Sequence, residues 1–117
     1  MKYGYLTRGE NECIVAKVSK TSNFFERMRG LLGTSKLNTN EGLLISPCSS
    51  VHTFGMRYTI DLIFLDNNWT IVKTVKSLQP WRMAASKSAI MVLELASHML
   101  DKKQLSVGQQ LEWHDAT

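Results

Sequence analysis

The sequence contains few cysteines and prolines and has no long apolar run. Of its 117 residues, two are cysteines (Cys13 and Cys48) and two are prolines, which argues against a disulfide-rich scaffold and a proline-rich disordered chain. No apolar stretch approaches the roughly 20 residues that a membrane-spanning helix requires. Arg8, Glu10 and Glu12 stand where a secretory signal peptide would have its apolar region. We therefore expect a cytoplasmic protein without a transmembrane segment, in which both cysteines are free thiols.

Basic runs are also absent from the sequence. The formal net charge is +4, but Lys102 and Lys103 form the one pair of adjacent basic residues. Nucleic-acid-binding proteins usually gather basic residues on one face or alternate them with stacking aromatics. The pattern therefore predicts a solvated basic surface, and it does not favour nucleic acid as a partner.

The composition is that of an ordinary globular protein, with 44% hydrophobic and 21% charged residues. A chain of this length buries enough surface for one core without disulfides or metals. We expect one domain over residues 1–117.

The hydrophobic pattern predicts many strands and two helices. Residues 23–33 carry apolar side chains at helical spacing and predict one firm amphipathic helix. Residues 97–105 predict a second, short helix. Short apolar or β-branched segments predict strands at 2–6, 13–18, 42–46, 59–66, 69–78, 89–96 and 109–114. The expected fold class is α+β, with a curved, largely antiparallel, barrel-like sheet.

Residues 46–66, SPCSSVHTFGMRYTIDLIFLD, concentrate side chains that carry chemistry. Other short segments accompany them in a fixed order: RMRGLLG (27–33), PWR (80–82), VLELA (92–96) and GQQLEW (108–113). Over about residues 12–113, this order resembles the domain of unknown function 192 family. The resemblance implies a small barrel-like α+β domain of bacteria and archaea, and it implies no assigned reaction. The chain departs from the family pattern at His98, where a glycine is usual, and at Gln109, where an aspartate is usual.

A cysteine nucleophile is one hypothesis for the 46–66 segment. A tight loop would bring His52 to Cys48 as a general base, and Asp61 would orient the imidazole. This arrangement would make the protein a hydrolase or transferase. The alternative is that Cys48 is a small buried hydrophobic residue and that His52 bonds to the loop backbone.

The sequence predicts no metal and no cofactor. Cys48, His52 and Asp61 are metal-ligating types, with His98 and His114 farther along the chain. However, no C-x-x-C or H-x-x-x-H pair supplies two ligands from one element.

Asp61 lies between apolar residues at the start of an expected central strand. A buried carboxylate requires a partner. We therefore expect Asp61 either to be exposed at an edge or to pair with Arg57, Arg82 or backbone N–H groups of residues 50–56. Glu94 poses the same question on another strand. Two carboxylates in one cleft would suit glycoside hydrolysis, but the sequence does not bring these two together.

The preferred hypothesis is a binding or accessory module that carries out no chemistry alone. Its expected ligand is a small polar or anionic molecule or a protein partner, and its oligomeric state is left open. The expected site residues are His52, Thr53, Met56, Arg57, Asp61, Trp81 and Arg82. An equal alternative for Trp81 is that it caps the open end of the barrel. The alternatives are the Cys48–His52 enzyme and a weak binder of an anionic polymer or a membrane surface.

Overall fold

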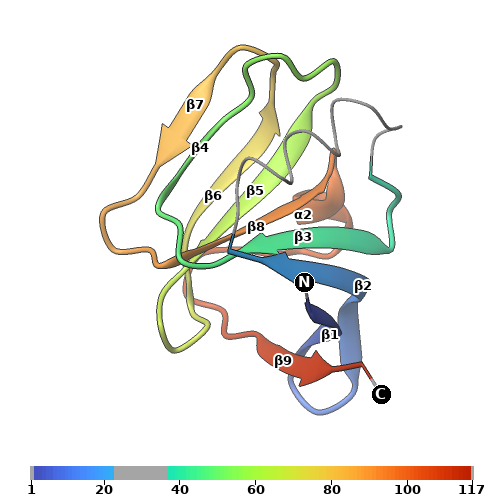
Figure 1. Cartoon of the computed structure of the whole chain (residues 1–117). Helices are drawn as coiled ribbons and strands as arrows, with labels where there is room; N and C mark the ends of the chain where they lie inside the picture. Colours follow the sequence, from blue (N-terminus) through green and yellow to red (C-terminus); the bar gives the residue numbers. More distant parts are fainter. Residues whose placement is uncertain (1, 23–36, 117) are drawn as a thin grey trace.

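The computed structural model describes residues 2–22 and 37–116, which form nine strands and one short helix (Figure 1). The helix is α2 (Met99–Lys102). The strands are β1 (Lys2–Arg8), β2 (Glu12–Thr21), β3 (Glu41–Ile45), β4 (Ser50–His52), β5 (Ile60–Leu65), β6 (Ile71–Leu78), β7 (Met83–Ala85), β8 (Met91–Ala96) and β9 (Glu112–Asp115).

Seven of the strands form one sheet, in the order β6-β5-β8-β3-β2-β1-β9. All neighbours in it are antiparallel except β2 and β3, which run parallel. The remaining strands, β4 and β7, pair with each other as a separate two-stranded ribbon beside the sheet (Figure 1). The largely antiparallel sheet expected from the sequence is therefore confirmed.

The predicted α+β class is wrong for the described residues, of which 53% lie in strands and 4% in a helix. The helix predicted over residues 23–33 lies outside the described residues. Residues 97–105 form a single helical turn because the flanking residues His98 and Gln104 adopt positive φ angles of 73° and 53°, which a right-handed helix does not accommodate.

The predicted barrel is also wrong. The sheet curves until Thr70, just before β6, forms an isolated bridge with Gln110, just before β9. The edge strands β6 and β9 do not continue this pairing as a ladder in the described chain. The sheet therefore remains open.

Each face of the sheet carries its own hydrophobic core. Because side chains alternate along a strand, Ile63 and Leu93 lie on one face, and Leu62 and Val92 lie on the other. The first core includes Leu6, Ile14, Val15, Val18, Leu44, Ile63, Leu93, Leu95, Met99 and Leu100. The second core includes Ile45, Val51, Met56, Ile60, Leu62, Phe64, Ala89 and Val92, with Cys48 and Ala84 packed against it. The β4–β7 ribbon therefore covers the second core.

The turn between β5 and β6 has the hairpin chemistry that the sequence predicts. Asp66 Oδ1 accepts hydrogen bonds from the N–H groups of Asn68 (2.9 Å) and Thr70 (3.0 Å).

Within the two described ranges, no helix is both long enough and apolar enough to cross a membrane.

Candidate functional site

The β4–β7 ribbon brings together two loops that are distant in sequence. His52, at the end of β4, pairs with Met83, at the start of β7, so the loop after β4 lies beside the loop before β7. Thr53 is fully buried between the two loops. Its hydroxyl donates a hydrogen bond to the carbonyl of Gln79 (2.7 Å) and accepts one from the N–H of Arg82 (2.9 Å).

The backbone of Thr53 also hydrogen-bonds to the loop before β7. Its N–H donates to the carbonyl of Arg82 (2.8 Å), and its carbonyl accepts from the N–H of Trp81 (3.1 Å). The structure thus assembles three of the residues that the sequence singled out, Thr53, Trp81 and Arg82. Hydrogen bonds to buried groups fix their backbone in place before any ligand arrives.

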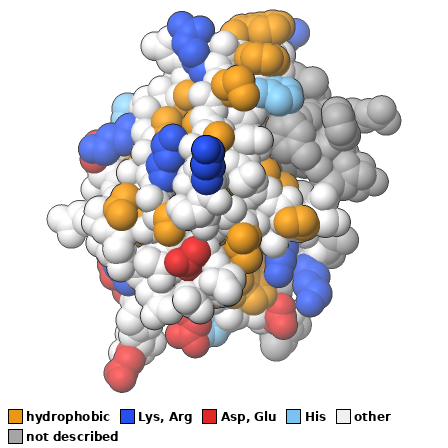
Figure 2. Space-filling view, turned by 90° about the vertical axis from the view of Figure 1, so that its left-hand side faces the viewer, with side chains coloured by type: hydrophobic (Ala, Val, Ile, Leu, Met, Phe, Trp, Pro, Cys, Tyr) orange, Lys and Arg blue, Asp and Glu red, His pale blue; other side chains and the backbone are white. Residues whose placement is uncertain are grey.

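Three large apolar side chains project from these loops and from the start of β7. Phe54 is 45% exposed, Trp81 is 64% exposed and Met83 is 66% exposed. We call these three residues the aromatic face. The ring of Phe54 lies 5.7 Å from that of Trp81 and 4.9 Å from that of His52, measured between centroids. Figure 2 shows hydrophobic side chains gathered at the upper end of this side of the molecule, next to a histidine and close to Lys or Arg side chains.

The chain segment that carries the aromatic face is basic. Residues 49–90 contain five cationic residues and two carboxylates. The carboxylates are Asp61 and Asp66, and both accept hydrogen bonds from backbone N–H groups. Arg57 and Arg82 are exposed. Arg82 follows Trp81 directly in the chain, so it offers a positive charge beside the aromatic face.

Met56 does not belong to this surface. It is 3% exposed and packs in the second core with Val51. Met56 therefore supports the loop from within the second core.

Asp61 also points away from the aromatic face. It is 1% exposed, and its two oxygens accept hydrogen bonds from the N–H groups of Ser77 and Leu100, both at 2.8 Å. It pairs with Leu95 across β5 and β8, which places its side chain on the face of the first core. The ribbon that carries His52 covers the opposite face. Asp61 therefore joins the end of β6 to the start of α2 and does not orient His52.

Asp61 and Glu94 occupy opposite faces of the sheet. Glu94 is buried on β8, where it pairs with Leu62 and Leu43, two positions on the face opposite to that of Asp61. Paired residues share a face, so the two carboxylates share no cleft. This geometry removes the two-carboxylate arrangement that glycoside hydrolysis requires.

The two cysteines are free thiols, as expected from the sequence. The Cys48 thiol donates a hydrogen bond to the carbonyl of Ser50 (3.0 Å), and its N–H donates to the carbonyl of Ile90 (2.8 Å). The carbonyl of Ser50 is thus an acceptor for the Cys48 thiol. The described residues contain no group of three or more His, Cys, Asp or Glu side chains placed to hold a metal ion.

We predict that the reactivity of Cys48 does not depend on His52, because the thiol donates to the carbonyl of Ser50. In a Cys13→Ser background, His52→Ala should change the iodoacetamide alkylation rate of Cys48 at pH 7 by less than about twofold. A drop of tenfold or more in this rate would show that the imidazole activates the thiol. That result would favour the enzyme hypothesis.

Phe54 and Met83 are the members of this surface that the sequence analysis missed. Phe54 could have been identified as exposed, because it is a large apolar residue directly before a glycine in an expected loop. Met83 follows Trp81 and Arg82 in the chain. Its place beside His52 results from the pairing of β4 with β7, which the sequence does not show.

Comparisons with known proteins show which family this sequence matches. The model of the DUF192 family, described as "Uncharacterized ACR", matches residues 5–113. A UPF0127 protein of Thermococcus sibiricus is 33% identical over 104 residues, which cover 83% of this chain and 66% of the relative. A UPF0127 protein of Pyrococcus abyssi is 36% identical over 66 residues, or 56% of each chain. The matches thus span less than two thirds of the length of these archaeal relatives.

Two bacterial crystal structures share the fold. One is a proposed transcription regulator of Sinorhizobium meliloti, with a TM-score of 0.79 and 18% identity, covering 96% of this chain and 92% of the other. The other is a protein of unknown function from Novosphingobium aromaticivorans, with a TM-score of 0.74 and 15% identity, covering 95% and 84%. At these identities the likeness concerns the fold alone.

Proposed function

The chain belongs to the DUF192 family, and on that premise we propose that it is a binding module for an acidic segment of a protein partner that also carries apolar side chains. The binding surface is the aromatic face together with Arg57 and Arg82. The module contributes recognition and no chemistry of its own.

The observation that supports this proposal is the exposure of the aromatic face on a fixed backbone. Trp81 leaves 64% of its surface in water although the hydroxyl of Thr53 and the carbonyl of Arg82 hold its loop in place. Trp, Met and Arg are enriched in protein interfaces, and Trp and Arg are the commonest energetic hot spots. A preorganised surface also loses less conformational entropy on binding.

The charge of the surface favours an acidic partner. The carboxylates of residues 49–90 are engaged by backbone N–H groups, whereas Arg57 and Arg82 face solvent. Electrostatic complementarity accelerates encounter and selects among partners. A basic rim around apolar anchors therefore fits a segment that combines carboxylates with aromatic or large aliphatic side chains.

A polypeptide suits this geometry better than nucleic acid. Phe54, Trp81 and Met83 offer apolar contacts along the end of a two-stranded ribbon, which an extended chain can follow with its side chains. Single-stranded nucleic acid usually requires a positively charged groove along its backbone. The cations of residues 49–90 are dispersed, with no two adjacent in sequence.

The test is a selection from a random peptide library displayed on phage, with the immobilised chain as bait. We expect enriched peptides to carry net negative charge and at least one aromatic or large aliphatic residue. Trp81→Ala should weaken the best peptide about 30-fold, the effect of a hot spot of about 2 kcal/mol. The matched control is Tyr3→Ala, which removes an aromatic residue of similar exposure (61%) from β1 and should leave the affinity within about twofold.

The proposal is wrong if the selection yields no binding peptides or if the enriched peptides bind Trp81→Ala as tightly as the wild type. It is also wrong if a single-stranded oligonucleotide binds more tightly than every selected peptide.

A further inference from the structure

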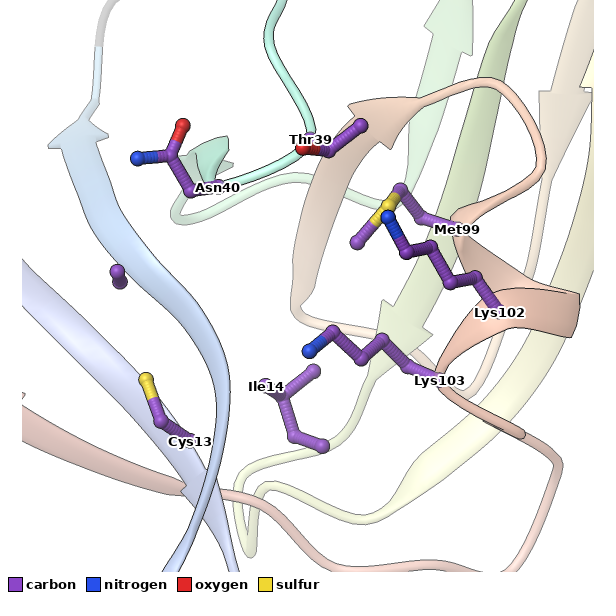
Figure 3. A pocket seen from close by; sticks show the side chains of 8 residues that line it. Cys13, Ile14, Thr39, Asn40, Met99, Lys102 and Lys103 are labelled. Atoms are coloured by element: carbon purple, nitrogen blue, oxygen red, sulfur yellow. The ribbon is translucent and has the colours of Figure 1, made fainter.

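A cavity of about 300 Å³ lies on the other side of the molecule, between β2 and α2 (Figure 3). It forms where β3 begins. The parallel pairing of β2 with β3 starts at Lys17, whose N–H donates to the carbonyl of Asn40 (2.9 Å). The earlier residues of β2 therefore have α2 and Asn40 as neighbours on this side instead of a strand.

The cavity is lined by apolar side chains at its base and by two lysine side chains. Ile14 and Met99 are buried and belong to the first core. Lys102 and Lys103 extend from the α2 side, and Asn40 lies on the opposite wall with its amide directed away from the lysines (Figure 3). The volume is at the lower end of the range for small-molecule sites.

The backbone that carries these lysines is held in place from β1. Arg8 Nη2 donates to the carbonyl of Lys103 (2.9 Å), and Arg8 Nη1 donates to the carbonyl of Gln104 (2.9 Å). The same guanidinium forms two hydrogen bonds with Glu12, at 2.8 and 2.9 Å. The Arg8 contact also lowers the pKa of the Glu12 carboxyl, so Glu12 remains a charged partner of Arg8.

The nearby carboxylates have other cations as partners. Glu12 is paired with Arg8, and Asp101 is paired with Lys76 at 2.6 Å. Lys102 and Lys103 take part in no ion pair within the described part of the chain. Lys103 lies close enough to Glu12 to contribute to the lowered pKa of that carboxyl, so Glu12 compensates part of the charge of Lys103. Two ammonium groups nevertheless line one small space.

We infer that this cavity binds a small organic dianion, such as a phosphate monoester. Its charged head contacts Lys102 and Lys103, and its carbon body lies against Ile14 and Met99. Two ammonium groups match the two negative charges of the head, and each charged hydrogen bond is stronger than a neutral one. This site is separate from the aromatic face and does not depend on the function proposed for it.

Cys13 makes the inference testable because its exposed thiol lines the same cavity. In a Cys48→Ser background, the alkylation rate of Cys13 is measured with iodoacetamide, a neutral reagent that the lysines do not attract. The probes are phenyl phosphate, inorganic phosphate and phenol, at an ionic strength held constant with potassium chloride. Phenyl phosphate should protect Cys13 saturably and lower the rate at least about fivefold. Phosphate should protect more weakly, and phenol should have little effect.

The double variant Lys102→Gln/Lys103→Gln should raise the phenyl phosphate concentration for half-protection at least about tenfold. Lys87→Gln is the control for lost charge, because Lys87 is exposed and lies outside the cavity, and it should change this concentration less than twofold. The inference is overturned if protection is absent or not saturable, if phenol protects as well as phenyl phosphate, or if the double variant is protected like the parent.

Discussion

Replacing Asp61 with alanine is expected to lower the free energy of unfolding by about 4 kcal/mol. The carboxylate is 1% exposed and accepts hydrogen bonds from the N–H groups of Ser77 and Leu100. Alanine leaves both donors unsatisfied next to the first core, and each lost partner costs about 1–3 kcal/mol. It also opens a small cavity, which adds to the cost.

Urea unfolding followed by tryptophan fluorescence measures this loss, provided that the slope with urea concentration is unchanged. Asp61→Asn should lose about 2 kcal/mol, because one amide oxygen replaces two carboxylate oxygens. Asp66→Asn is the matched control. It also affects a carboxylate that bonds to two N–H groups, but in a turn that is partly open to water, and it should cost about 1 kcal/mol or less. A loss below about 1 kcal/mol for Asp61→Ala would show that the carboxylate does not hold β6 to α2.

The second large effect is expected for Thr53→Val. Valine keeps the shape of the buried side chain but removes the hydroxyl that donates to Gln79 and accepts from Arg82. The free energy of unfolding should fall by about 2 kcal/mol, because the partly buried carbonyl of Gln79 and N–H of Arg82 lose their partner. The loop that carries Trp81 should become mobile, so the affinity for a selected acidic peptide should fall about tenfold.

Both effects are measured on the same variant, by urea unfolding and by peptide titration. The matched control is Thr74→Val on β6, a partly exposed position whose hydroxyl makes no hydrogen bond within the described ranges. We expect a change within about 0.5 kcal/mol. If Thr53→Val unfolds at the wild-type urea concentration and binds the peptide unchanged, the hydroxyl does not organise the surface.

Most of the sheet can be predicted from the sequence because strand patterning is local. The apolar run of β5 and the Asp66-Asn67-Asn68 turn specify a central strand and the hairpin that follows it. The parallel pairing of β2 with β3 depends on how the chain returns to the sheet. That arrangement is a long-range property with no local signature.

The helix content could not be predicted as reliably. Residues 97–105 have a favourable helical pattern, but the positive φ angles of His98 and Gln104 restrict α2 to one turn. Ser97 hydrogen-bonds to Thr59 through their hydroxyls, so the segment before α2 is engaged with the loop before β5. Tertiary contacts of this kind override helix propensity.

The candidate site was predicted in part. The sequence grouped Thr53, Trp81 and Arg82, and the structure brings them together through hydrogen bonds. Asp61 was placed with the wrong partners because a one-residue change in strand register exchanges the two faces of a sheet. The sequence shows that the side chains of Asp61 and its two neighbours point to opposite faces of the sheet. It does not show which of the two faces the β4–β7 ribbon covers. The binding roles of the site residues remain predictions.

A ¹⁵N–¹H NMR titration of the chain with a selected acidic peptide would locate the binding surface residue by residue. We predict that the largest chemical-shift changes fall in residues 52–57 and 79–84 and include the indole N–H of Trp81. Shift changes confined to β1 and β9, or to the cavity between β2 and α2, would contradict the claim that the aromatic face is the binding surface.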